Sequence, residues 1–254
     1  MINIYFRTTS NKKQTTRPSW FSYEKCWNNL LATRNDNPIT VIHDGPVYDS
    51  WFYKIYENVE VLEIDSETKH IELCKEWEVK GETYIDRDEN GKEYEKRIEK
   101  PDREKAAGYL MYEIMFQNVV QKDNDLIYMV EDDYLHINGW TMALEDIFSI
   151  YNTLSYATLY DHPDKYTQRY VGSVSPIIMS NYCHWRFVPS SCGTYGGTVK
   201  AFFEDKDIHQ NNLGDHNKFI KLGEKNRGIV SPLPGLATHC IDPWLSRFRD
   251  WSIV

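Results

Sequence analysis

The chain has 254 residues, of which 41% are hydrophobic and 26% are charged, and it contains 8 Trp and 18 Tyr. A chain this apolar and aromatic buries a core, so an intrinsically disordered protein is excluded. Its net charge of -9 argues against binding nucleic acid mainly through phosphate neutralisation, because that mode needs a basic surface. Length and composition therefore predict one globular domain without a nucleic-acid partner.

The amino terminus and the cysteines bear on the cellular location of the protein. Residues 1–7 lack the basic start and long apolar run of a secretory signal, and no 18 apolar residues run together. We therefore expect a protein without a membrane span, in the cytoplasm. The five cysteines contain no Cys-x-x-Cys pair, so free thiols are expected.

Strand-like and helical patterns alternate along much of the chain, which is typical of a layered α/β domain with a mostly parallel sheet. Apolar or β-branched runs predict strands over residues 2–6, 39–43, 59–64, 126–130 and 156–160. Helical spacing predicts helices over residues 19–31, with Ser19 as a candidate cap, and over residues 105–120, 140–150 and 215–222.

Residues from about 67 to 100 differ from the rest of the chain because they are strongly charged. Asn90-Gly91 lies between two alternating segments, which is a signal for a hairpin turn. The stretch therefore predicts an inserted β-hairpin. A lid, an acceptor platform, a contact surface and a solvated decoration all remain open as its role.

Three consecutive acids, Glu131-Asp132-Asp133, follow the apolar run of residues 126–130. Ligands of open α/β sheets bind at the carboxyl ends of the strands, so this cluster is placed to face a substrate. Mg²⁺ and Mn²⁺ prefer oxygen ligands and keep positions open for substrate phosphates. The alternative is the first turn of a helix, where acids are favoured by the helix dipole.

Residues 126–136, which read Leu-Ile-Tyr-Met-Val-Glu-Asp-Asp-Tyr-Leu-His, resemble the strand and Asp-x-Asp-type (DXD) motif of GT-A fold glycosyltransferases. Residues 4–7, 17–22, 158–166 and 231–239 are similar to small family-2-like members from bacteria, phages and large viruses. The resemblance implies a single catalytic domain with a GT-A (Rossmann-like) mixed, mostly parallel sheet flanked by helices. Residues 1–133 would form its nucleotide-binding half and residues 134–254 its acceptor-binding half.

The resemblance also implies roles for the acids and for one late histidine. Asp133 would coordinate the metal, Asp132 would support the metal or the ribose, and Glu131 would lie near the ribose or base. His239 lies where a histidine completes the metal shell in this fold, and imidazole suits Mn²⁺. A histidine that merely satisfies a loop is the alternative.

Three residues of the first half would line the nucleotide pocket by the same resemblance. Arg7 and Thr8 follow the first strand, and Asp44 follows the second. Asp44 precedes Gly45-Pro46, so it is equally suited to forming a turn.

Inverting sugar transfer needs a general base at the acceptor hydroxyl. Asp215 stands at the start of the helical stretch to residue 222, where inverting members of the family place their catalytic Asp. Its alternative role is that of an N-cap. Asp205 and Asp207 are weaker candidates, because residues 204–207 have the composition of a solvated charged run.

Acceptor recognition can use aromatic rings, which pack on sugar faces, and glycines, which permit close approach. Trp185, Tyr195 and the segment 193–197 are candidates, although core packing is the commoner fate of such rings.

The sequence thus predicts a hexosyl- or pentosyltransferase of glycan biosynthesis that uses Mn²⁺ or Mg²⁺ and moves a sugar, with inversion, from a nucleotide-diphosphate donor to a glycan or other hydroxyl acceptor. A nucleotidyltransferase of related α/β fold is an alternative. It is disfavoured because residues 7–13 contain no glycine for a phosphate loop. The other alternative is a non-catalytic carbohydrate- or nucleotide-binding protein that retains the fold.

Overall fold

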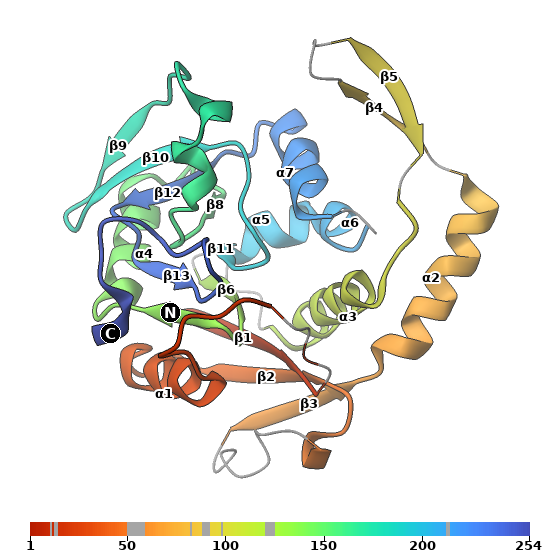
Figure 1. Ribbon diagram of the computed structural model, residues 1–254, viewed down its shortest axis with the longest axis horizontal. Helices are drawn as coiled ribbons and strands as arrows, with labels where there is room; N and C mark the ends of the chain where they lie inside the picture. The colour runs from red at the N-terminus through yellow and green to blue at the C-terminus, as the bar shows by residue number, and fades with distance from the viewer. Residues whose placement is uncertain are drawn as a thin grey trace.

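The computed structural model describes residues 1–10, 12, 15–49, 59–81, 83–87, 92–97, 99–119, 125–211 and 214–254. Within these ranges the centre of the molecule is a nine-stranded sheet with the order β3-β2-β1-β6-β11-β8-β12-β10-β9 (Figure 1). Its strands are β1 (Ile2–Thr9), β2 (Ile39–Asp44), β3 (Glu60–Ile64), β6 (Leu126–Glu131), β8 (Tyr156–Ala157), β9 (Ile177–Met179), β10 (His184–Val188), β11 (Tyr195–Thr198) and β12 (Ile229–Leu233).

The sheet is mixed and mostly parallel, as predicted. β3, β2, β1 and β6 are mutually parallel, and β11 is antiparallel to both of its neighbours, β6 and β8. β12 is parallel to β8, whereas β10 is antiparallel to β12 and to β9. Two of the nine strands, β10 and β11, therefore run against the others. The carboxyl ends of β1, β2 and β6 consequently meet at one edge, where the acid cluster begins.

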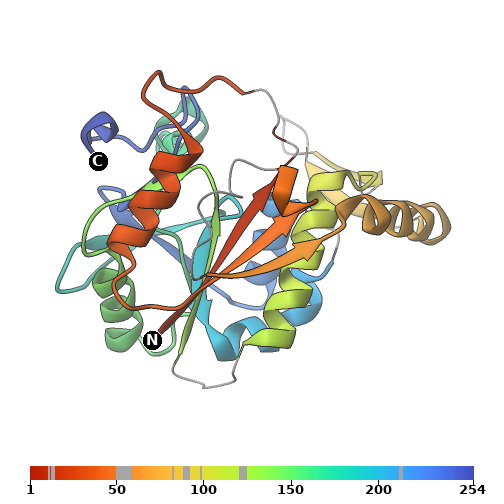
Figure 2. The same ribbon diagram turned by 90° about the horizontal axis from the view of Figure 1, so that it is seen from below.

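Helices cover both faces of the sheet (Figure 2). They are α1 (Tyr23–Thr33), α2 (Ser66–Lys80), α3 (Arg103–Asn118), α4 (Trp140–Ile150), α5 (Val199–Glu204), α6 (Lys206–His209) and α7 (Asp215–Glu224). Side chains of α1 and α4 pack with one set of strand residues, and those of α3, α5 and α7 pack with the other set. Among the described residues, none of these helices has the length and apolar character that spanning a bilayer requires.

Strand periodicity explains the two cores. Tyr128 and Val130 of β6 face the core formed with α1 and α4, whereas Ile127 and Met129 face the core formed with α3, α5 and α7. Successive side chains of a strand point to opposite faces, so a continuous apolar run is what a strand covered on both faces requires.

Most predicted elements are confirmed, and their ends differ for local reasons. α4 has the predicted bounds, but α1 begins at Tyr23, because the hydroxyl of Ser22, not that of Ser19, accepts the backbone N–H of Lys25 at 3.0 Å. β1 continues to Thr9 because it keeps pairing with β2. β8 is only two residues long, so most of the predicted strand over residues 156–160 is a loop.

The charged insertion contains the predicted hairpin, but its first half is a helix. α2 begins where Asp65 accepts the backbone N–H groups of Glu67 and Thr68, and it ends at Gly81, which has a positive φ of 56°. β4 (Thr83–Arg87) and β5 (Glu93–Arg97) then pair as an antiparallel hairpin beyond α2 (Figure 1). The prediction of a hairpin from residue 67 is therefore wrong for α2, and the Asn90-Gly91 turn lies outside the described residues.

Close packing between β8 and β11 generates a first prediction. A Cβ atom on Gly197 would lie 2.6 Å from the Ser155 carbonyl oxygen and 2.7 Å from Cδ1 of the buried Tyr156. We expect Gly197→Ala to lower the free energy of unfolding by about 1–3 kcal/mol in urea denaturation, because neither neighbour can move away. In the control Gly223→Ala the new Cβ meets no heavy atom within 4 Å, and a gain of roughly 0.5–1 kcal/mol is expected. Equal stability of the two variants would show that the contact between β8 and β11 has room for a methyl group.

Buried histidines generate a second prediction. His136 is fully buried against the Tyr128 hydroxyl, 2.9 Å from Nε2, and burial lowers its pKa to about 3. The unfolded chain takes up this proton near pH 6.5 and the folded chain does not, so stability falls as pH decreases between these values. We expect a loss of about 2 kcal/mol from His136 between pH 6.5 and pH 5.

Urea unfolding across this pH range measures the effect. The slope of unfolding free energy against pH reports how many protons are taken up on unfolding. His136→Phe should lower this number by close to one, whatever the stability of the variant itself. An unchanged slope would show that His136 is protonated in the folded state.

Candidate functional site

The candidate site forms where β6 ends and the chain turns back. Residues 131–133 lead into β7 (Tyr134–His136), which pairs antiparallel with β13 (Ala237–His239) and brings His239 opposite Tyr134. The backbone N–H of Cys240 donates to the carbonyl of Asp133 at 2.9 Å. The rings of Tyr134 and His239 stack with centroids 4.7 Å apart. This pairing brings together Asp133 and His239, which are 106 positions apart in the chain.

Glu131, Asp133 and His239 form a candidate metal-binding group. One ligand atom from each lies within 4.8 Å of the others, and His239 Nε2 is 3.0 Å from Asp133 Oδ2. Asp133 Oδ1 is buried and has no hydrogen-bond partner among the described residues. Two carboxylates and an imidazole are donors that suit Mn²⁺ or Mg²⁺, and the open oxygen leaves a lone pair for such an ion. The residues present therefore fit a divalent cation.

Asp133 and His239 thus come together as the resemblance implied. Glu131, which was expected near the ribose or base, is the third member of the group, while Asp132 faces Lys12. The three acids do not converge on one point.

Each acid of the cluster has its own cationic partner from the segment 7–17. The pairs are Arg7–Glu131, Lys12–Asp132 and Arg17–Asp133. Arg17 lies 2.8 Å from Asp133 Oδ2, and its guanidinium is 4.6 Å from the Phe21 ring centroid. These cations and the carboxylates that they pair with are mostly shielded from solvent, so the ion pairs are less screened than pairs on an open surface.

The pKa values of the three acids are shifted in different directions. Burial would raise the pKa of Asp133, but His239 and Arg17 outweigh it and lower that pKa to about 2. Burial raises the pKa of Glu131, with Arg7 opposing it, and burial also raises the pKa of Asp132. Asp133 is therefore the acid of the cluster that is held most firmly as a carboxylate, which is the form that binds a metal.

A cavity of about 240 Å³ is lined by Arg7, which pairs with Glu131, by Gly193, and by residues of α3, α6 and α7. Glu131 Oε1 lies 3.1 Å from where a Cβ on Gly193 would be, so a side chain at this position would have to displace the carboxylate by a few tenths of an ångström. Asp215 lines the cavity, and its charge is among those that raise the pKa of Glu131, after burial. The charge of the candidate base Asp215 therefore acts on Glu131, a member of the candidate metal group.

Asp215 is the first residue of α7 and does not cap it. Gly214 occupies the N-cap position without a side-chain hydrogen bond, so the alternative role as N-cap is wrong. The Asp215 side chain is 44% exposed, and its Oδ1 lies 3.3 Å from Lys218 Nζ. A carboxylate that is partly open to a cavity and fixed by one cation can accept a proton from a bound hydroxyl.

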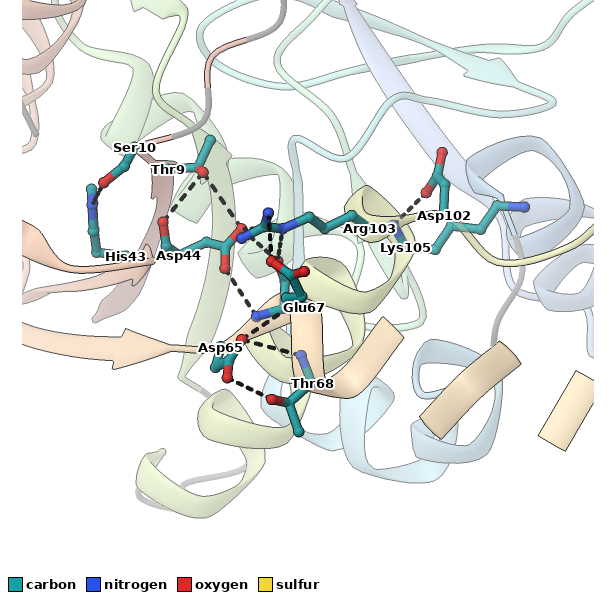
Figure 3. A network of polar contacts seen from close by, with 11 residues as sticks. Thr9, Ser10, His43, Asp44, Asp65, Glu67, Thr68, Asp102, Arg103 and Lys105 are labelled. Atoms are coloured by element: carbon teal, nitrogen blue, oxygen red, sulfur yellow. Dashed lines mark hydrogen bonds and ion pairs between the residues drawn. The ribbon is translucent and has the colours of Figure 1, made fainter. Parts of the chain in front are cut away.

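Asp44 and Thr8 lie at the same edge of the sheet but make internal contacts. Asp44 is 4% exposed and belongs to a network of polar contacts with Arg103 (Figure 3). Its Oδ1 accepts the backbone N–H of Ser66 at 3.0 Å, and its Oδ2 accepts the Ser66 hydroxyl at 2.7 Å. Arg103 of α3 also donates to the Ser66 hydroxyl, at 2.8 Å. Thr8 is buried, and its hydroxyl accepts from Lys12 at 3.4 Å. The described contacts of Asp44 thus tie β2 to α2 and α3.

The aromatic candidates for the acceptor surface are core residues. Trp185 and Tyr195 are both 0% exposed. The Trp185 indole donates to Ser180, and the Tyr195 hydroxyl contacts Tyr112 and His209. Rings enclosed on all sides cannot stack on a sugar, so the expectation that these two contact an acceptor is wrong.

Asp205 differs from its expected solvated position. It is fully buried where α5 ends, within 3.0 Å of Lys225 and 2.9 Å of Arg227. Asp207 is exposed, as expected.

Three cations of the site were not singled out from sequence, namely Lys12, Arg17 and Lys218. Lys12 belongs to a polar run after β1 whose side chains give no periodic signal. Arg17 stands in a segment that carries the family resemblance, which was the one available signal. Lys218 has the spacing of an ordinary surface helix pair with Asp215, and only the tertiary structure shows that it is buried.

Comparison with known proteins gives no family assignment. No family model matches the chain, and no curated protein matches it. The solved structures similar to it include a CMP:2-keto-3-deoxy-manno-octonic acid synthetase complexed with CTP, with 10% identity, a TM-score of 0.46, and coverage of 91% of this chain and 88% of that chain. Another is mouse xyloside xylosyltransferase 1 in its apo form, with 7% identity, a TM-score of 0.41, and coverage of 89% and 84%.

A third similar structure is a mycobacterial protein with 9% identity, a TM-score of 0.39, and coverage of 99% of this chain and 68% of that chain. These similarities reach neither the identity nor the TM-score that would assign the chain to a family or an activity.

Proposed function

We propose that this protein is a metal-dependent glycosyltransferase that moves a sugar, with inversion, from a nucleotide-diphosphate donor to a hydroxyl acceptor. The observation that carries the proposal is the group Glu131, Asp133 and His239, with a buried open oxygen on Asp133. Arg7, the partner of Glu131, lines the same cavity as Asp215. Metal ligands and a separate carboxylate base are the two components that inverting transfer requires.

In the proposed reaction each side chain has a limited task. Glu131, Asp133 and His239 hold a divalent cation, which when bound stabilises the negative charge of the diphosphate leaving group. Arg7, close to Glu131, contributes a positive charge at the same place. These groups favour departure of the nucleoside diphosphate by compensating charge that increases as its bond to the sugar breaks.

Asp215 carries out the proton transfer. Its carboxylate takes the proton of the acceptor hydroxyl while that oxygen bonds to the anomeric carbon, and the bond from this carbon to the diphosphate oxygen breaks. The electron pair of the broken bond leaves with the nucleoside diphosphate. Attack from the side opposite the leaving group inverts the anomeric configuration.

Metal and donor binding test the first half of the proposal. We expect Mn²⁺ with a matching nucleoside diphosphate to stabilise the protein by about 2.7 kcal/mol at 100 times the dissociation constant, and Asp133→Ala to abolish this shift. Thermal melting with Mn²⁺ and each of UDP, GDP and CDP measures it. The exposed Asp207→Ala is the control and should keep the shift. A shift of the same size in Asp133→Ala would contradict the metal assignment.

Asp215→Asn tests the second half. The amide cannot accept the proton, so the rate of transfer should fall by roughly 10²–10⁴-fold while the nucleotide-dependent thermal shift persists. Nucleoside diphosphate release from UDP-glucose, UDP-galactose and GDP-mannose is the assay, with water as acceptor where no sugar acceptor is known. Transfer at the parental rate would rule out Asp215 as the base. Pyrophosphate release from CTP or UTP would instead favour a nucleotidyltransferase.

A further inference from the structure

Lys218 is a lysine whose ammonium group is buried beside the candidate base. The residue is 5% exposed, and Nζ lies 3.1 Å from the Tyr112 hydroxyl and 3.3 Å from Asp215 Oδ1. Burial lowers the pKa of Lys218, but the neighbouring Tyr112 and Asp215 outweigh it and raise that pKa, so the amine stays charged. A buried ammonium is stable only when it is paired and hydrogen-bonded, which ties Lys218 to these two partners.

A chain of buried hydrogen bonds continues from Tyr112 through the core. The Tyr112 and Tyr195 hydroxyls are 2.8 Å apart, and the Tyr195 hydroxyl is 3.0 Å from Nδ1 of His209. Nε2 of His209 is 2.9 Å from the Tyr156 hydroxyl, whose proton is shared between Asp205 Oδ2 at 2.9 Å and the Ala201 carbonyl at 3.1 Å. All five residues are at most 5% exposed, so bulk water weakens these bonds little.

The two ends of the chain determine the direction of every donor. The Lys218 ammonium can only donate, and the Asp205 carboxylate can only accept. Each tyrosine hydroxyl therefore accepts from the Lys218 side and donates toward Asp205. His209 accepts at Nδ1 and donates at Nε2, which requires the neutral ring, and burial lowers the pKa of His209 well below its usual value.

The far end of the chain is anchored by two cations. Lys225 lies 3.0 Å from Asp205 Oδ1, and Arg227 lies 2.9 Å from Oδ2. Asp205 follows α5, Tyr156 belongs to β8 and Tyr195 belongs to β11. The first turn of α7, which carries Asp215, is thereby fixed to the sheet through Lys218.

We propose that Lys218 is the positioning residue of Asp215, held in place by this one-directional chain of hydrogen bonds. In this role Lys218 engages Oδ1 of Asp215 and leaves Oδ2, to which no described residue donates a hydrogen bond, for the acceptor hydroxyl. The inference rests on the proposed function, since it assigns Asp215 the role of base. Lys218 itself does not touch the reacting atoms.

Lys218→Met tests the proposal with a matched control on the same helix. Lys221 forms an exposed pair with Glu224 at the same i,i+3 spacing, 3.1 Å long. In nucleoside diphosphate release from UDP-glucose, UDP-galactose and GDP-mannose with Mn²⁺, Lys218→Met should lower kcat roughly tenfold or more with the donor KM within about twofold, because misplacing a base affects the chemical step. Lys221→Met should change neither constant.

Two gentler variants keep the test valid if Lys218→Met does not fold. Lys218→Arg retains the charge and should keep more of kcat than Lys218→Met. Tyr195→Phe removes one hydroxyl of the chain without changing any charge, and it should lower kcat by roughly threefold at an unchanged donor KM. A purely structural role of the chain would lower the melting temperature and leave kcat of the folded protein at the parental value.

The outcomes separate this inference from the proposed function. If the wild-type protein releases nucleoside diphosphate from no donor, or if Asp215→Asn keeps its activity, the proposed function fails and the inference fails with it. If Asp215→Asn is inactive while Lys218→Met and Tyr195→Phe keep the parental kcat, the inference alone is overturned. A raised donor KM at an unchanged kcat in Lys218→Met would also overturn it.

Discussion

The site depends on the neutralisation of three consecutive carboxylates by cations from one segment of the chain. The side chains of Glu131, Asp132 and Asp133 are only 18%, 11% and 11% exposed. Unpaired charges so far from water would each cost several kcal/mol, more than a domain of ordinary stability can tolerate in one place. Arg7 lies in β1 opposite Glu131 of β6, and Lys12 and Arg17 follow β1 in the chain. The parallel pairing of β1 with β6 is thus what makes the acid cluster compatible with the fold.

The same charge balance determines which atoms can receive a ligand. His239 and Arg17 both approach Oδ2 of Asp133, whereas Oδ1 has no hydrogen-bond partner among the described residues. An incoming divalent ion needs an oxygen with an open lone pair, so Oδ1 offers the point of attachment that disturbs the existing pairs least. Asp132 is less suited to bind the ion, because Lys12 already pairs with its Oδ2. The last acid of the motif is therefore the one best suited to a metal.

The sequence predicts the parts of the fold that repeat a strong local pattern. The strand over residues 126–130 and the helix over residues 140–150 were both predicted, because the first is an apolar run too short for a helix and the second has helical apolar spacing. α2 was mistaken for part of a hairpin because, within this helix, only Ser66 and Leu73 are buried, so it has no apolar stripe to reveal its period.

The site is less predictable than the fold because its residues meet through tertiary contacts. Asp133 and His239 are joined by the pairing of β7 with β13, and each of these strands has only three residues. Strands this short carry no readable alternation. Without the family resemblance, nothing in the sequence would connect the two residues. Lys218 is difficult to recognise for a different reason. The i,i+3 spacing predicts its pairing with Asp215, but the sequence does not show that Lys218 is buried.

Three buried aspartates near the sheet can be compared by what their oxygens contact. Both oxygens of Asp44 accept hydrogen bonds from Ser66, and both oxygens of Asp205 face cations. A carboxylate satisfied in this way acts as an anchor between elements, and a ligand could reach it only by breaking those contacts. Oδ1 of Asp133 has no such partner in the part of the chain that the structure describes. An orphaned buried acceptor costs about 1–3 kcal/mol, and a cation bound there would remove that cost, which separates Asp133 from the two structural acids.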